Sequence, residues 1–178
     1  GYSGDMKGGE KTVPLSGFWA DKSLFEVFSF TMLSGDPSTA LKDPFTVVVT
    51  ESTAKKLFGN TNALGKTIVC PVKKERKEFI VTGVVKDVPV FSHMRFDVLA
   101  SLSTREITEK DNKNELAWDN IWNAYTYLLL PKNIDLKNLQ ANLDAIAFKE
   151  DKTVENTTIK LSLQPLTKIA LGQEMNNA

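Results

Sequence analysis

Few residues in this chain are able to carry catalysis. His93 is the only histidine and Cys70 the only cysteine among 178 residues. A Ser–His–Asp or Cys–His arrangement would therefore have to use His93, and no Gly-x-Ser-x-Gly elbow is present to hold a nucleophile. The alternation of residues around His93 is typical of a strand edge, which favours a turn or packing role for its imidazole. We therefore expect no catalytic residue.

Metal and cofactor sites also lack their usual residues. One histidine and one cysteine exclude the common zinc ligand sets, and the acidic and amide side chains at 111–115 are not spaced like an EF-hand loop. No phosphate-binding loop and no Gly-x-Gly-x-x-Gly is present, so we expect neither a metal nor a cofactor. Cys70 lies in an apolar, strand-like stretch and is expected to be a buried, unreactive thiol.

Two tryptophans are the candidate partner-binding residues. Trp118 and Trp122 are four residues apart, and Tyr125 and Tyr127 follow them. Exposed aromatic side chains often dominate protein interfaces; the alternative is that both indoles anchor a polar segment to the core. A second candidate, the charged run 71–78, is interpreted as the solvated tip of a hairpin rather than as a site for an anionic partner.

Composition narrows the class of protein. Basic and acidic residues balance at 22 each, which argues against a nucleic-acid partner. Apolar content of 42% is ordinary for a globular protein. No stretch reaches the roughly 18–20 apolar residues that cross a bilayer, and the polar first residues do not resemble a signal peptide.

Residues 44–69 carry the clearest folding pattern. The apolar run 45–49 predicts a buried strand, and a helix with Ala54, Leu57 and Phe58 on one side follows it. Thr50 or Ser52 is expected to cap this helix, and the glycine at position 59 to end it. A further strand is expected at 66–69.

The rest of the chain is predicted to alternate strands with short helices. Residues 1–12 are glycine-rich and expected to be flexible. Strands are expected at 13–20, 79–85 with a bulge at Gly83, 94–101, 125–130 and 158–163, and helices from position 21 or 23 to about 33 and from Asp135 to 148. Strand–helix–strand thus occurs twice, at about 45–69 and 125–163, which predicts an α+β fold of two related halves plus a β-hairpin subdomain.

Several segments, in the same order over about 140 residues, resemble the MacB-like periplasmic core domain. This domain is the extracytoplasmic part of permeases in the MacB/FtsX class of ABC transporters. The segments are 25–30 with 33–36, VVVTESTAKKLFG at 47–59, LGK at 64–66, VTGVV within 79–87, SH and FD within 89–101, 125–131 and 161–166. The matching positions are turn glycines and strand apolar residues, so they identify a fold rather than a site.

The resemblance implies a domain organisation. A porter-like lobe would comprise about 13–66 and 122–170, and a smaller β-rich, Sabre-like lobe would be inserted at about 67–121. Together they would form one extracytoplasmic region, on the periplasmic side of the cytoplasmic membrane, between transmembrane helices that are absent from this chain.

The resemblance also implies a function. The domain would be non-catalytic, and a separate cytoplasmic ABC ATPase domain or subunit would hydrolyse ATP. The domain would couple that hydrolysis to substrate export or to partner action outside the membrane, with a periplasmic adaptor or a second permease copy as a further partner. The alternative is a stand-alone periplasmic module that binds a ligand or a protein.

Overall fold

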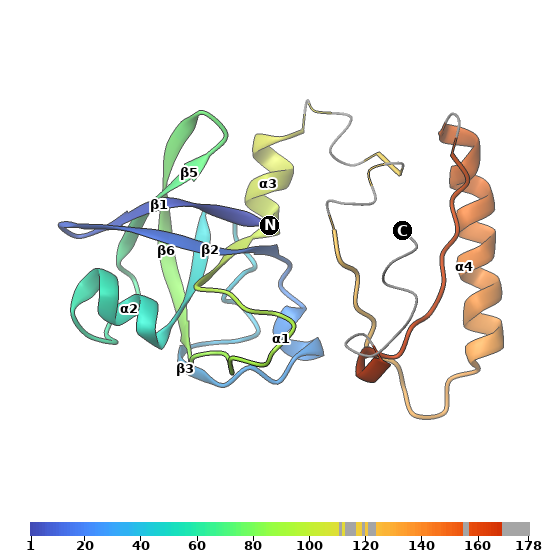
Figure 1. Ribbon diagram of the computed structural model, residues 1–178, viewed down its shortest axis with the longest axis horizontal. Coiled ribbons are helices and arrows are strands. Elements are labelled where there is room, and N and C mark those ends of the chain that lie inside the picture. Colours follow the sequence, from blue (N-terminus) through green and yellow to red (C-terminus); the bar gives the residue numbers. More distant parts are fainter. Residues whose placement is uncertain (111, 113–116, 119, 121–123, 155–156, 169–178) are drawn as a thin grey trace. The chain divides into compact units, whose positions relative to one another are not determined.

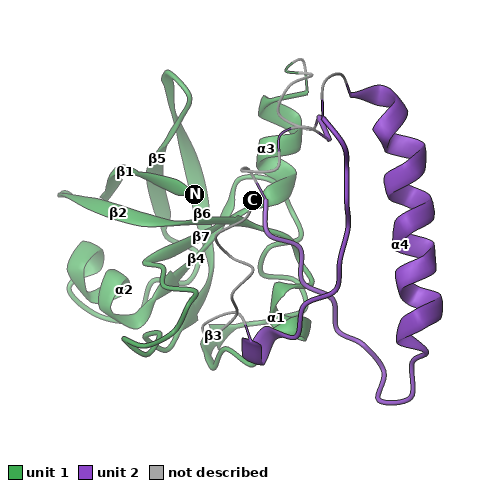
Figure 2. Cartoon of the chain, turned by 45° about the vertical axis from the view of Figure 1, so that its right-hand side comes forward, with its two compact units in different colours: residues 1–112 green, residues 113–178 purple. Residues whose placement is uncertain are grey.

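The computed structural model describes residues 1–110, 112, 117–118, 120, 124–154 and 157–168 (Figure 1). The chain divides into two compact units, residues 1–112 and residues 113–178 (Figure 2). Among the helices in these described ranges, none combines the length and apolar character needed to cross a membrane. The fold mixes α-helices with a β-sheet, as the sequence predicts.

The described part of the first unit holds seven strands and three short helices. The strands are β1 (Tyr2–Gly8), β2 (Lys11–Ala20), β3 (Met32–Gly35), β4 (Thr46–Thr50), β5 (Thr67–Val72), β6 (Glu75–Val85) and β7 (Val98–Ser101). The helices are α1 (Leu24–Val27), α2 (Glu51–Phe58) and α3 (Leu102–Thr108).

Six of the seven strands pair into a closed ring. The sheet order is β3-β6-β4-β7-β2-β1-β5, and β5 also pairs with the first half of β6, which closes the ring. Strand β3 pairs with the C-terminal end of β6, from Gly83 to Val85. The β2–β7 and β4–β6 pairs are parallel, and the remaining pairs are antiparallel. Closure leaves the six strands with neighbours on both sides, as in a small barrel.

Two apolar clusters hold this ring, one on each face of β4. Val47 and Val49 belong to the larger cluster, and Val48 belongs to the smaller one, because successive strand side chains point to opposite faces. The larger cluster contains the fully buried Phe79. Burial on both faces explains why the sequence of β4 is continuously apolar rather than alternating.

The predicted strand–helix–strand pattern at 45–69 is confirmed. The Thr50 side chain caps α2, accepting a hydrogen bond from the Thr53 backbone N–H. Gly59 follows the last turn with a φ of 78°, a left-handed conformation that glycine adopts without steric cost. The β5–β6 hairpin is also confirmed, and Lys73 and Lys74 form its tip.

Two predictions for the first unit were wrong. Residues 2–8 are not flexible but form β1, because the long β2 strand pairs with them from Tyr2 to Gly8. The expected helix from 21 or 23 to about 33 is limited to α1, which has no buried residue. Ser23 precedes α1 without capping it through its side chain, and donates hydrogen bonds to Asp21. Residues 32–35 pair with β6 as β3.

Two further strand predictions concern β6 and β7. The register of β6 against β4 shifts by one residue at Thr82, beside Gly83, which confirms the predicted bulge. The Thr82 hydroxyl there donates to the Ala40 carbonyl. The strand predicted at 94–101 begins only at Val98, because the residues before it belong to an irregular connection.

The second unit contains the long helix α4 (Leu136–Glu150). Asp135 caps it as predicted, accepting hydrogen bonds from the backbone N–H groups of Lys137 and Asn138. The strands predicted at 125–130 and 158–163 are not formed: both segments are irregular where they are described. The Gln140 side chain instead bonds the backbone of the second segment, donating to the Leu161 carbonyl at 2.7 Å. The second strand–helix–strand half is therefore not observed, and the predicted lobe boundaries remain a prediction.

Candidate functional site

The tryptophan pair lies partly outside the described residues. Trp118 belongs to the second unit, and 40% of its surface is exposed, which makes it accessible to a partner. Trp122 lies outside the described residues. The two indoles as a docking pair therefore remain a prediction.

His93 has a packing environment. Its imidazole lies 6.2 Å from the ring of Phe28, measured between ring centroids, in the connection between β6 and β7. This contact agrees with the predicted turn or packing role. Within the described ranges, no group of three or more His, Cys, Asp or Glu side chains is arranged to hold a metal ion.

Cys70 is fully buried in the larger apolar cluster, as predicted. Burial raises the pKa of its thiol to about 11. A thiol that is both inaccessible and protonated at neutral pH is a poor nucleophile. We therefore assign Cys70 to the core.

Asp87 joins the end of β6 to the start of α2. Its Oδ1 accepts a hydrogen bond of 2.9 Å from the Ser52 backbone N–H, and its Oδ2 accepts one from the Ser52 hydroxyl. Desolvation opposes ionisation of this carboxyl, but the hydrogen bonds from Ser52 outweigh it and lower the pKa of Asp87. The hydroxyl donates directly to the carboxylate with no imidazole between them, so the pair acts as a tether rather than as a catalytic dyad.

Replacing Asp87 with asparagine is expected to lower the free energy of unfolding by about 1 kcal/mol at pH 7, because α2 loses an anionic cap. The loss is modest because the carboxyl is largely exposed. The folded-state pKa lies below the unfolded value of about 4, so the contribution is complete above that value and is lost as pH falls through the folded-state pKa. Urea unfolding from pH 7 to pH 3 measures this.

The matched control for this prediction is Glu10→Gln, at the exposed β1–β2 turn. It should leave the free energy of unfolding within about 0.5 kcal/mol of the wild type. A stability loss in Asp87→Asn that stays constant across the pH range would show that the carboxylate charge is not involved.

A second polar tether, formed by Asp97, holds the connection between β6 and β7 at its C-terminal end. The Asp97 carboxylate accepts hydrogen bonds from the backbone N–H and the hydroxyl of Ser16, at 3.0 and 3.2 Å. The Asp97 N–H donates to the Ser16 carbonyl at 2.7 Å. Sequence reasoning missed both tethers because their partners are 35 and 81 residues apart. The available signal was that Asp87 follows the apolar run of β6 and Asp97 precedes that of β7.

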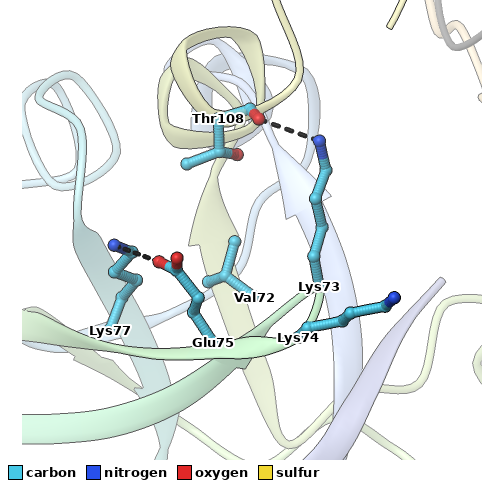
Figure 3. A pocket seen from close by; sticks show the side chains of 6 residues that line it. All are labelled: Val72, Lys73, Lys74, Glu75, Lys77 and Thr108. Atoms are coloured by element: carbon cyan, nitrogen blue, oxygen red, sulfur yellow. Dashed lines mark hydrogen bonds and ion pairs between the residues drawn. The ribbon is translucent and has the colours of Figure 1, made fainter.

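An open hollow of about 720 Å³ lies beside the tip of the β5–β6 hairpin (Figure 3). It is lined by Val72, Lys73, Lys74, Glu75, Lys77 and Thr108. Lys73 Nζ donates to the Thr108 carbonyl at 2.9 Å, where it satisfies the C-terminal end of α3. Lys77 pairs with Glu75, and Lys74 extends away from the other lining side chains.

The bonding in this hollow supports a solvated hairpin tip. Two of its three ammonium groups already donate to partners within the protein, Lys73 to the Thr108 carbonyl and Lys77 to Glu75. The arrangement agrees with the interpretation of the charged run 71–78 drawn from the sequence.

Comparisons with known proteins place the fold. The sequence profile of the MacB-like periplasmic core domain matches residues 2–146. A domain of a proposed permease protein from Porphyromonas gingivalis superimposes with a TM-score of 0.60 and 17% identity, over 95% of this chain and 77% of that one. The periplasmic region of MacB from Actinobacillus actinomycetemcomitans gives 0.53 and 19%, over 88% and 73%. At these identities the structural likeness shows the fold alone. The comparison with curated proteins finds no match.

Proposed function

The chain belongs to the family of MacB-like periplasmic core domains, and we propose that it works as the periplasmic region of an ABC transporter permease. The observation that carries this proposal is the family match over residues 2–146. In this role the domain stands outside the cytoplasmic membrane, joined to transmembrane helices of the same permease. A separate cytoplasmic ATPase domain or subunit hydrolyses ATP.

The proposed role of the domain is to couple that hydrolysis to export or to the action of a partner outside the membrane. The first unit suits such a role because its ring of strands is closed and its β6–β7 connection is held at both ends, by Asp87 and Asp97. A body of this kind transmits a movement without deforming. The serine hydroxyls and carboxylates of these two tethers are used in contacts within the unit.

The partner is proposed to be a periplasmic adaptor or a second permease copy, and Trp118 and Trp122 are proposed to contact it. Replacing both with alanine should weaken co-purification of the partner with the full-length protein. Phe148→Ala is the matched control, because it removes an exposed aromatic ring from α4 of the same unit. Co-purification that survives the double replacement would exclude the pair from the interface.

Fractionation of native cells tests the proposed function. An antibody against this chain should detect a band far larger than 19.8 kDa, which stays with the membrane through a carbonate wash. A soluble band near 19.8 kDa would contradict the permease assignment and favour a stand-alone periplasmic binding module.

A further inference from the structure

The connection between β6 and β7 presents two apolar side chains at a tight turn. The Ser92 backbone N–H donates to the Pro89 carbonyl at 2.9 Å, so Val90 and Phe91 occupy the two corner positions. Val90 is 67% exposed and Phe91 is completely exposed, at 101%. Phe91 is the most exposed large apolar residue of those described.

The rest of this connection is held firmly. The Lys86 N–H donates to the Thr31 carbonyl at 2.9 Å, and Asp87 and Asp97 form the tethers described above. Between these points, Phe96 is a buried member of the smaller apolar cluster. Val88 and Met94 pack against that cluster. The ring of Phe96 meets that of Phe30 edge-on at 5.3 Å. The connection therefore buries Phe96, partly covers Val88 and Met94, and leaves the turn outside.

The charged residues beside the turn are of both signs and differ in how they are bound. From Phe91 onward, exposed residues alternate with covered ones, so that Phe91, His93 and Arg95 are outermost. Lys86 is exposed at the other side. The two carboxylates of the connection, Asp87 and Asp97, accept hydrogen bonds from serine side chains, whereas the cations Lys86 and Arg95 are exposed. A partner surface that is apolar at its centre and has a carboxylate at its rim would complement Phe91 and Arg95.

We propose that Val90 and Phe91 insert into an apolar pocket of a partner protein, and that Arg95 pairs with a carboxylate at the rim of that pocket. An aromatic anchor beside an arginine is the composition typical of interface hot spots. Lipid is the weaker candidate, because even one myristoyl chain binds a membrane only marginally and two short side chains bury less apolar surface. The inference rests on the proposed function in placing this turn outside the membrane, where a protein is accessible to it.

Photocrosslinking in native cells tests this surface on the full-length protein. A benzophenone amino acid at position 91 should give one discrete adduct with another protein. The same group at position 64, where Leu64 is 48% exposed in the same unit, should not give that adduct. Adding Arg95→Glu to the position-91 protein should reduce the adduct at least about tenfold, whereas Arg95→Lys should largely retain it. Lys86→Glu provides a second charge reversal. Equal amounts of each variant in the membrane fraction would show that the variants fold.

The inference would be overturned by adducts with lipid alone, by an adduct with a second copy of this protein, by no adduct, or by a protein adduct that both charge reversals leave unchanged. If fractionation still places the protein in the membrane, any of these outcomes would leave the proposed function intact. A soluble protein of 19.8 kDa would instead reject the proposed function.

Discussion

Replacing Gly17 with alanine is expected to lower the free energy of unfolding by about 3 kcal/mol or more, although it adds only one methyl group. A Cβ at position 17 would lie 1.7 Å from the carbonyl oxygen of Val98, its neighbour in the parallel β2–β7 pair. The obstacle is backbone, so no side-chain rotation relieves it. This loss is a large part of a typical total of about 5–15 kcal/mol.

Gly59→Ala is the matched control, since no atom lies within 4 Å of the Cβ that it adds. Its cost is the left-handed backbone conformation alone, about 1–2 kcal/mol. Urea unfolding followed by circular dichroism compares the two variants. Equal losses in both would show that β2 and β7 are not as closely apposed as the ring requires.

Phe79→Ala is expected to lower the free energy of unfolding by about 3–5 kcal/mol, because it empties the centre of the larger cluster. Phe79 is fully buried, and its ring meets Phe45 edge-on at 5.7 Å and lies 6.3 Å from Trp19. The variant should also change the near-ultraviolet circular dichroism of the folded protein, since Trp19 loses a ring neighbour.

The adjacent residue provides the control for Phe79. Ile80 is 53% exposed on the same strand, so Ile80→Ala should cost no more than about 1 kcal/mol. If Ile80→Ala destabilised the chain more than Phe79→Ala, the inward and outward faces of β6 would have been assigned the wrong way round.

Local patterns in the sequence predicted the elements whose signals are local. Helix α2 has its cap and its terminating glycine within ten residues, and the β5–β6 hairpin has its strands on either side of a short charged tip. Asp135 likewise lies directly before α4. In each case the residues that decide the structure are neighbours in the chain.

Elements that depend on distant partners were not predictable in the same way. Strand β1 contains two glycines of its own and becomes a strand only because β2 pairs with it. A helix was predicted to continue to about residue 33, but pairing with β6 draws residues 32–35 into β3. The turn from Pro89 to His93 is predicted by the sequence, but the exposure of its apolar side chains, Val90 and Phe91, is not. These side chains are exposed because neighbouring residues of the connection, and not they, pack in the smaller cluster.

The central claim, that this chain is the periplasmic region of a permease, is tested most directly by labelling a cysteine from outside the cell. Lys74→Cys places a thiol at the exposed hairpin tip, in a full-length protein whose cysteines outside these 178 residues have been replaced. Cys70 is buried and provides an internal control, since the protein without Lys74→Cys should remain unlabelled. A maleimide that cannot cross the cytoplasmic membrane is predicted to label the Lys74→Cys protein in intact cells. Labelling that appears only after the cells are lysed would place the domain in the cytoplasm and contradict the account.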